Sequence, residues 1–306
     1  MLLVVGSVAL DSVETPFGAR EDALGGSATY FSAAASLLAP VQVVGVVGDD
    51  FPFAELEFLR ARGVHLDALE RVPGRTFRWK GRYGYDLNSA QTLDTQLNVF
   101  EHFEPRLDAR ARRADRLFLG NIDPELQLRV LQQVERPRLV CADTMNYWIS
   151  SKREQLMALL PRIDVLMVND AEARQLAGEA NVMKAAAAIE RMGARAVCIK
   201  RGEHGAMLVS GNEAFFAPAY PLADVIDPTG AGDSFAGGFL GLIDRNGASD
   251  LGALRQAVVM GCTIASFTVE AFSLDRLRDL TLAEVRSRFE AFRKLTDYEA
   301  LHASIT

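Results

Sequence analysis

The residues best suited to chemistry lie in the run Asp227-Pro-Thr-Gly-Ala-Gly-Asp233, which leads directly into an apolar segment of helical pattern. Gly230 and Gly232 carry no Cβ that would keep a ligand away, and the backbone N–H groups between Gly230 and Asp233 can converge on an anion. The following helix adds the positive end of its dipole. Asp233 would stand beside this anion as a base for an attacking hydroxyl. The alternative is a plain helix start with an aspartate cap.

This run resembles the C-terminal signature of the ribokinase-like sugar and nucleoside kinases, the phosphofructokinase B type. The resemblance implies that Asp233 is the catalytic base and that the amides of Gly230, Ala231 and Gly232 form the anion hole during transfer of the γ-phosphoryl group of ATP. It also implies that Thr229 contacts the nucleotide. Asp227 is expected to order the turn; in some relatives its counterpart helps to bind a monovalent cation such as K⁺.

A second glycine turn, Lys200-Arg-Gly-Glu-His-Gly205, follows a predicted strand. A basic side chain beside two glycines suits nucleotide phosphates. Taken alone, such glycines are common in strand–turn–strand connections. Together with the first motif, the segment resembles the second ATP-binding loop of the family, which implies that Lys200, Gly202 and Gly205 bind the nucleotide.

A possible metal motif, Asn169-Asp-Ala-Glu172, begins at the end of another predicted strand. Asn169 could simply cap the next helix, because Glu172 lies three residues further on, which is the spacing of a capping box. The spacing also resembles the Asn-x-x-Glu motif of the family, in which both side chains hold water ligands of Mg²⁺. One residue can do both, and the resemblance implies a magnesium site at Asn169 and Glu172.

The acceptor is expected to bind near the N-terminus. Gly6-Ser-Val-Ala-Leu-Asp11 leaves the first predicted strand, and Gly25-Gly26-Ser27 precedes an alanine-rich helical segment. An ionised aspartate accepts two hydrogen bonds from neighbouring hydroxyls, as on a sugar. The resemblance implies that Asp11, Gly25, Gly26 and Ser27 bind the acceptor, whereas the alternative for Asp11 is a loop cap.

Two positions depart from the sugar kinases. Tyr30 replaces the asparagine of their Gly-Gly-x-x-x-Asn pattern, and Trp148 replaces the arginine of Asp-Pro-Asn-x-Arg in the run Asp143-Thr-Met-Asn-Tyr-Trp148. The same run places Asn146 among the implied acceptor-binding residues. Loss of arginine removes a clamp for a carboxylate or phosphate. A neutral acceptor is therefore expected, and the added aromatic side chains raise the prospect of a nucleoside.

Composition sets the frame for these motifs. The chain has 306 residues, of which 49% are hydrophobic and 24% charged, which is ordinary for a globular protein. A net charge of −7 argues against nucleic acid or an anionic membrane as a partner. Three scattered cysteines, without a C-x-x-C pair, indicate neither a zinc site nor a disulfide framework, and favour reduced thiols in the cytoplasm. No membrane span is expected.

Apolar runs alternate with helical patterns, which predicts an α/β fold with a mostly parallel central sheet and helices on both faces. We expect one ribokinase-like domain over residues 1–306. The predicted strands are Leu2–Gly6, Val41–Val47, Arg116–Leu119, Leu139–Ala142, Val165–Val168 and Ala196–Lys200, followed by a hairpin, Gly205–Ser210 with Ala214–Ala217. The predicted helices are Ser27–Leu38, Phe53–Arg62, Pro124–Val134, Lys152–Leu160, Ala171–Ala177, Val182–Met192, Ala231–Asp244, Leu251–Ala271 and Leu282–Leu295.

Two segments alternate with strand period instead: Thr76–Tyr85, in which rings and charges alternate, and Gln96–Phe103. They predict a small antiparallel sheet, which the resemblance implies is a lid over the substrate, built from residues 12–20 and 74–104. The four aromatic residues between 77 and 85 would be too many for a sheet that faces only water. A homodimer through the lid and packing onto the main domain are both consistent with them.

The expected function is transfer of the γ-phosphoryl group of ATP to a hydroxyl of a small neutral sugar or sugar-like substrate, with a nucleoside kinase as the alternative. A nicotinamide-dependent oxidoreductase would need G-x-G-x-x-G after an early strand, which Gly6–Asp11 does not provide. A Walker-type NTPase is excluded because Gly-x-x-x-x-Gly-Lys-Ser/Thr is absent. A non-catalytic ATP-binding regulator would keep the fold, but the intact Asp233, Asn169 and Glu172 speak against it.

Overall fold

The computed structural model describes residues 1–297, and at its centre lies a nine-stranded sheet in the order β13-β12-β11-β10-β9-β8-β1-β4-β5. The strands from β11 to β5 run parallel, and β12 and β13 extend one edge as an antiparallel hairpin. The predicted, mostly parallel sheet is thereby confirmed. Its strands are β1 (Leu2–Val5), β4 (Val41–Val47), β5 (Val64–Arg71), β8 (Arg116–Leu119), β9 (Leu139–Asp143), β10 (Val165–Asn169), β11 (Ala196–Lys200), β12 (Ala206–Ser210) and β13 (Glu213–Ala217).

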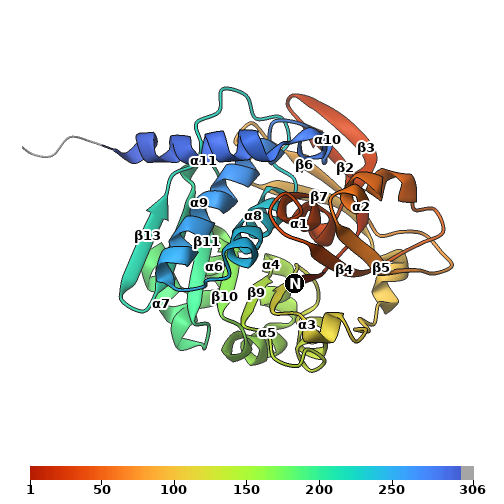
Figure 1. Ribbon diagram of the computed structural model, residues 1–306, viewed down its shortest axis with the longest axis horizontal. Coiled ribbons are helices and arrows are strands. Elements are labelled where there is room, and N and C mark those ends of the chain that lie inside the picture. The colour runs from red at the N-terminus through yellow and green to blue at the C-terminus, as the bar shows by residue number, and fades with distance from the viewer. Residues whose placement is uncertain (298–306) are drawn as a thin grey trace, which may run out of the picture.

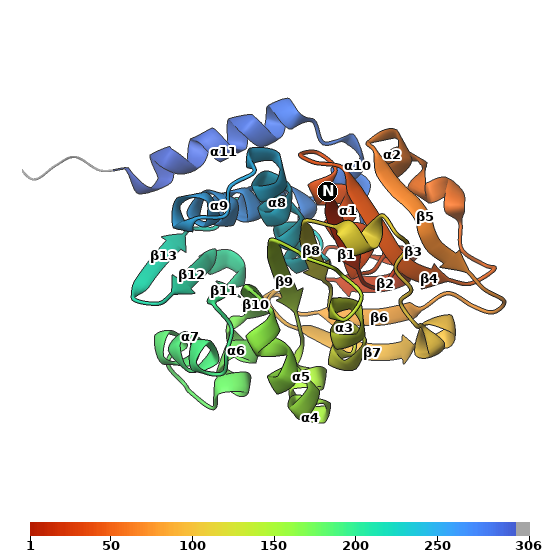
Figure 2. The same cartoon turned by 60° about the horizontal axis from the view of Figure 1, so that its bottom comes forward.

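Helices cover both faces of this sheet, as Figure 2 shows. One face carries α1 (Ser27–Ala35), α2 (Glu57–Ala61), α8 (Ala231–Asn246), α9 (Leu251–Thr268), α10 (Asp275–Asp279) and α11 (Leu282–Thr296). The other carries α3 (Pro124–Leu131), α4 (Asn146–Ser151), α5 (Arg153–Leu159), α6 (Asp170–Ala177) and α7 (Val182–Arg191). By length and composition α9 could cross a membrane, but 61% of it is buried within the protein, against α8 and neighbouring elements. Its apolar surface is that of a core helix.

The strand order changes direction at β1. The chain runs from β1 to β4 and β5 on one side, and then returns to β8 on the other side of β1. Figure 1 shows β4 and β5 on the right of the molecule and β9, β10, β11 and β13 towards the left. In open α/β sheets, ligands bind beyond the carboxyl ends of the strands at such a switch point. The segments that leave β1, β8, β9, β10 and β11 therefore meet along one edge, and they carry Ser7, Gly120, Asp143, Asn169 and Lys200 at or just beyond the strand ends.

A separate four-stranded sheet, which we call the lid, has the order β3-β2-β6-β7. Its strands are β2 (Ala9–Thr15), β3 (Gly18–Gly25), β6 (Arg78–Tyr83) and β7 (Ala90–Gln96). The first lid segment thus extends from residue 9 to residue 25, beyond the expected 12–20 at both ends. The register pairs Asp11 with Trp79 and Glu14 with Arg82. Asp11 and Trp79 share one face of the lid, and the ion pair Glu14–Arg82 lies on the opposite face.

The lid aromatics have several different environments. Phe77 packs on Phe100, with ring centroids 5.5 Å apart, and the Trp79 ring lies over Gly81. The Tyr83 hydroxyl reaches Thr229 in the main body of the protein, whereas Tyr85 is 87% exposed. Packing within one chain thus accounts for most of the aromatic run, and a homodimer through the lid stays a prediction.

One expected strand is absent, one strand went unrecognised, and one expected helix is divided in two. Gln96–Phe103 is not a strand: β7 ends at Gln96, and Asn98–His102 forms a 3₁₀ turn that stacks Phe100 on Phe103, 5.4 Å apart. Side chains three residues apart lie on the same side of a 3₁₀ turn, so the apolar residues of this segment fit such a turn as well as they fit the alternation of a strand. This ambiguity explains the error. Strand β5 went unrecognised because its polar residues interrupt the apolar run. The helix expected over Phe53–Arg62 is a 3₁₀ turn, Phe53–Leu56, followed by α2.

A stacked ring pair joins α1 to the sheet and can be tested. The rings of Phe31 and Phe118 lie 4.5 Å apart, and both side chains are fully buried. We expect Phe118→Ala to lower the free energy of unfolding by about 3–5 kcal/mol, measured by urea denaturation, because the cavity cannot collapse between a helix and a sheet. Phe216→Ala, at a side chain that is 55% exposed, is the control and should change it by less than about 0.5 kcal/mol. Equal losses would contradict this account of the core.

Candidate active site

The glycine turn before α8 is packed from both sides. Gly230 is the N-cap of α8 with φ 72°, a conformation that favours glycine. A Cβ at Gly230 would lie 2.3 Å from a ring carbon of Tyr30, and one at Gly232 would lie 2.9 Å from Nζ of Lys200. Glycine is required at position 230 by its φ and by the tyrosine ring, and at position 232 it leaves room for the Lys200 ammonium group. Asp233 follows as the third residue of the helix.

A cluster of charges lies beside this turn. Lys200 Nζ donates to Asp143 Oδ2 at 2.7 Å, and both side chains are largely buried. Burial alone would lower the pKa of Lys200, but the charges of Asp143 and Glu172 outweigh it and raise this pKa. Burial raises the pKa of Asp233 to about 7; the charge of Asp143 adds to this shift, and that of Lys200 opposes it. Asp233 therefore changes its charge near neutral pH.

Asp11 lies on β2, within the lid, rather than in a loop after β1. Its Oδ2 accepts from the Gly26 N–H at 3.3 Å, and a Cβ at Gly25 would lie 2.0 Å from the same oxygen. Burial raises the pKa of Asp11 to about 7, against this hydrogen bond. Ser27 N donates to Ser7 Oγ at 3.0 Å, which fixes the start of α1 to the end of β1. The predicted residues Asp11, Gly25, Gly26 and Ser27 are thus brought together.

Asp227 orders the glycine turn, as expected. Its Oδ1 accepts from the Thr229 N–H at 2.9 Å and its Oδ2 from the Ser273 N–H at 3.3 Å, while the residue is 1% exposed. Thr229 Oγ1 in turn lies 3.4 Å from the Tyr83 hydroxyl. Two hydrogen bonds from backbone amides, one buried and one partly buried, therefore hold the turn, and the lid touches it through Tyr83.

Asn169 and Glu172 form a complete capping box at the start of α6. Asn169 Oδ1 accepts from the Glu172 N–H at 2.8 Å, and Glu172 Oε2 accepts from the Asn169 N–H at 2.7 Å. Burial raises the pKa of Glu172 to about 7, with the charge of Asp143 acting in the same direction and that of Lys200 opposing. The capping box is confirmed, the magnesium role of Asn169 and Glu172 stays a prediction, and the charges of Asp143 and Lys200 both act on the pKa of Glu172.

These oxygens fit magnesium only as part of a larger set. Across residues 1–297, no group of three or more His, Cys, Asp or Glu side chains is arranged to hold a metal. The donors at Asn169 and Glu172 are an amide carbonyl and a carboxylate, which are the oxygens that Mg²⁺ prefers, and Mg²⁺ commonly takes its other ligands from water and phosphates. The residues therefore fit an ion that arrives with a nucleotide.

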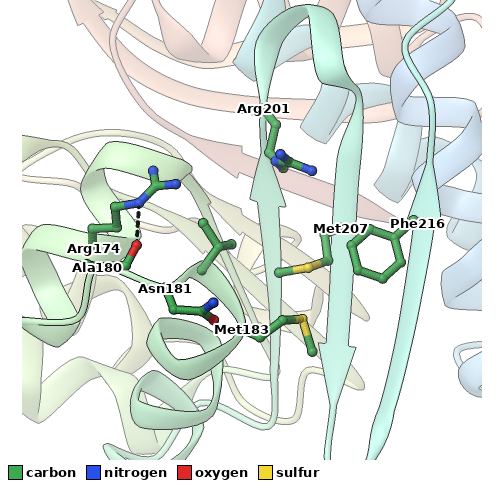
Figure 3. A pocket seen from close by; sticks show the side chains of 8 residues that line it. Arg174, Ala180, Asn181, Met183, Arg201, Met207 and Phe216 are labelled. Atoms are coloured by element: carbon green, nitrogen blue, oxygen red, sulfur yellow. Dashed lines mark hydrogen bonds between the residues drawn. The ribbon is translucent and has the colours of Figure 1, made fainter.

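The second glycine turn lies between β11 and β12. A Cβ at Gly205 would lie 2.0 Å from the Ala217 carbonyl oxygen, and one at Gly202 would lie 2.3 Å from Oδ1 of Asn88, which belongs to the lid loop between β6 and β7. Beside this turn, on the α6–α7 face, lies a shallow pocket of about 300 Å³ that Arg201 lines together with Met207 and Phe216 (Figure 3). This pocket includes none of the predicted site residues. Arg201 lines the pocket, whereas its neighbour Lys200 pairs with Asp143 in the charge cluster.

The remaining predicted residue is not joined to the cluster. Asn146 is exposed at the first position of α4, and its Oδ1 accepts from the Tyr147 N–H at 2.8 Å. Sequence reasoning also passed over Asp143 as a site residue, although an acid at the end of a buried strand was a usable signal. Tyr30 was noted only as a departure from the Gly-Gly-x-x-x-Asn pattern. Its contact with Gly230, and that of Tyr83 with Thr229, could not be predicted because they join segments distant in sequence.

Comparisons with known proteins agree with this fold. The family model for pfkB family carbohydrate kinases matches residues 4–277. A cytidine kinase of Thermococcus kodakarensis is 31% identical over 78% of this chain and 87% of its own. The structure of a Burkholderia thailandensis nucleoside kinase in complex with ADP-inosine covers 100% of both chains at 20% identity, with a TM-score of 0.76. Ribokinase of Thermotoga maritima covers 95% of this chain and 99% of its own, at 21% identity and a TM-score of 0.74.

The fold and the family match define an ATP-using phosphotransferase with an alcohol group as acceptor. More narrowly, the chain belongs to the pfkB family of carbohydrate kinases. Proteins similar to it in sequence include a cytidine kinase and a 1-phosphofructokinase.

The raised pKa of Asp233 has a consequence for stability. Since the folded state holds this proton up to about pH 7 and an unfolded aspartate loses it near 4, the free energy of unfolding falls as pH rises between these values. We expect Asp233→Asn to raise the melting temperature at pH 8, and the difference from the wild type to shrink towards pH 4.5. The exposed Asp224→Asn is the control and should match the wild type at both pH values. A difference independent of pH would contradict the assignment.

Proposed function

We propose that this protein transfers the γ-phosphoryl group of ATP to a hydroxyl of a small neutral sugar or sugar-like acceptor. The observation that carries the proposal is Asp233, partly buried at the start of α8, with a pKa raised to about 7. A base with a pKa near the working pH is the most effective in proton transfer. Asp233 takes the proton of the attacking hydroxyl, and the N–H groups of Gly230, Ala231 and Gly232 stabilise the phosphoryl charge.

Nucleotide binding is assigned to the two glycine turns. Lys200, which lies against Gly232, brings a positive charge to the anion hole, and Gly202, Gly205 and Thr229 are the other residues assigned to the nucleotide. When bound, Mg²⁺ neutralises phosphate charge, and Asn169 and Glu172 would hold its water ligands. A monovalent cation such as K⁺ would bind near Asp227, which orders the turn.

The charges of the acceptor side support a neutral substrate. Asp11 and Asp233 act on each other as like charges, so an added phosphate or carboxylate would be repelled by both. The Lys200 ammonium is assigned to the nucleotide phosphates, and it already donates a hydrogen bond to Asp143 at 2.7 Å. Asp11 is then the residue that accepts hydrogen bonds from the acceptor hydroxyls, with Gly25, Gly26 and Ser27 shaping its surroundings.

A nucleoside is the second candidate acceptor. Trp79 shares the Asp11 face of the lid, and the Tyr83 hydroxyl reaches from the lid to Thr229. Aromatic side chains provide stacking surfaces for a base, while Asp11 would hold the ribose hydroxyls. The cytidine kinase relative supports the same choice.

The first test measures ADP release with Mg-ATP over a panel of neutral sugars and nucleosides, in potassium and in sodium buffers. We expect turnover on one class, and Asp233→Asn should lower kcat by about 10²- to 10⁴-fold, because a general base contributes that much. ATP binding by calorimetry should stay within about threefold, since the amides remain. Near-normal turnover in Asp233→Asn would remove the base assignment. ATP binding without turnover on any alcohol would favour a non-catalytic regulator.

The magnesium assignment is tested by Glu172→Gln, which keeps the capping-box geometry but removes the charge. We expect the Mg²⁺ concentration for half-maximal rate to rise about tenfold or more. Glu284→Gln offers a matched control, because Glu284 makes the equivalent capping box with Thr281 at the start of α11, away from this site. If both variants respond alike, Glu172 acts only through its helix.

A further inference from the structure

Arg78, the first residue of β6, joins the lid to the main body of the protein. Its Nη1 donates to Asp50 Oδ2 at 2.8 Å, in the turn after β4, and its Nε donates to Asp22 Oδ1 at 3.1 Å, on β3. Since the lid order is β3-β2-β6-β7, this side chain spans β2 to reach β3. Only 16% of the side chain is exposed. One cation is thus shared between the main body and the far side of β2.

Asp50 receives this cation from within a tightly bonded turn. Its Oδ1 accepts from both the backbone N–H and the hydroxyl of Thr76, each at 2.7 Å. Thr76 is fully buried, and its Oγ1 accepts from the Gly48 N–H at 3.0 Å. Burial alone would raise the pKa of Asp50, but the hydrogen bonds from Thr76 and Arg78 outweigh it and lower this pKa to about 2. We call Asp50, Thr76 and Arg78 the lid anchor.

The lid anchor lies one register position from the aspartate assigned to the acceptor. Strand β6 pairs with β2 so that Arg78 is opposite Leu10, the neighbour of Asp11, and the Leu10 N–H donates to the Phe77 carbonyl at 3.0 Å. Asp11 must also meet the Gly26 N–H, which lies at the start of α1 in the main body. At 3.3 Å this hydrogen bond is already long, so a small rotation of β2 would break it.

A second arginine on β6 shows what distinguishes Arg78. Arg82 donates from Nε and Nη2 to Glu14 Oε2, at 2.9 and 2.8 Å. Both of these residues belong to the lid, and both side chains are about half exposed. Such a surface pair adds little to stability and ties the lid only to itself. Arg78 is less exposed, and its Asp50 partner lies outside the lid.

We propose that Arg78 is a positioning residue for acceptor binding: by holding β6 and β3 to Asp50, it fixes the angle at which the lid presents Asp11 to the acceptor. The inference rests on the proposed phosphoryl transfer to an alcohol that Asp11 binds. The groups assigned to the nucleotide belong to the main body, so the lid anchor acts on the acceptor and leaves the affinity for ATP almost unchanged.

The test compares the steady-state kinetics of the wild type and Arg78→Gln, with Mg-ATP and the sugar or nucleoside on which the panel shows turnover. We expect KM for the acceptor to rise about tenfold, because charge-assisted hydrogen bonds to two carboxylates are lost, with KM for ATP within about threefold. Arg78→Lys can reach one carboxylate but not bridge both, and should restore the acceptor KM to within about threefold of the wild type.

Arg82→Gln is the matched control. It breaks an ion pair on the same strand but leaves the lid anchor intact, so its acceptor KM should stay within about twofold of the wild type. Amide hydrogen exchange followed by mass spectrometry adds a readout without substrate: peptides from residues 9–25 should exchange faster in Arg78→Gln than in Arg82→Gln.

The outcomes separate this inference from the function on which it rests. An unchanged acceptor KM in Arg78→Gln, with normal wild-type turnover, would overturn the inference alone. An equal rise in Arg82→Gln, or an equal rise in KM for ATP, would do the same, because any loosening of the lid would then have this effect. If melting curves show that Arg78→Gln does not fold, Arg78→Lys decides by a rise in acceptor KM alone. If the wild type neither binds nor phosphorylates any alcohol, by calorimetry and ADP release, the proposed function fails and the role of Arg78 fails with it.

Discussion

The Lys200–Asp143 ion pair is the interaction on which the arrangement of the site depends. Asp11, Asp233 and Glu172 all have a pKa of about 7, and Lys200 lowers those of Asp233 and Glu172. Carboxylates so close to one another cannot all ionise without a cation among them. A buried pair of this kind adds little to folding stability, because desolvation offsets the attraction. What it supplies is a fixed positive charge beside the glycine turn.

The sheet order follows from the need to assemble this pair. Lys200 and Asp143 are 57 residues apart in sequence, and they meet because β11, β10 and β9 lie side by side and parallel, with their carboxyl ends at one edge. The apolar strand interiors bury the sheet between two helix layers, and the polar strand ends remain at the switch point. The N-terminus of α8 lies at the same edge and places Asp233 beside Lys200 and Asp143. Helix α8 belongs to one helix layer, and α6, which carries Glu172, belongs to the other.

The sequence predicted the elements well where apolar runs were continuous, as in β4 and β10, because a strand buried on both faces has no other pattern. It failed at β5 and at Gln96–Phe103, where polar alternation and aromatic spacing fit more than one structure. The glycine motifs predicted the residue types at the turn. They could not predict that Tyr30 and Lys200 fill the spaces beside Gly230 and Gly232, because such contacts depend on how α1, α8 and β11 pack. Asn169 and Glu172 could be identified by their spacing. The effect of the Asp143 charge on Glu172 could not be predicted, because it too depends on how distant segments pack.

The lid touches both glycine turns. Tyr83, at the end of β6, contacts Thr229, and Asn88, in the loop that follows, lies against Gly202. One short hairpin thus spans the two segments assigned to the nucleotide and carries, on its neighbouring strand, the aspartate assigned to the acceptor. If the hairpin swings outward as a unit, it cannot uncover the acceptor without also giving up its contacts at both turns. Such a movement would therefore expose the acceptor side and both glycine turns together.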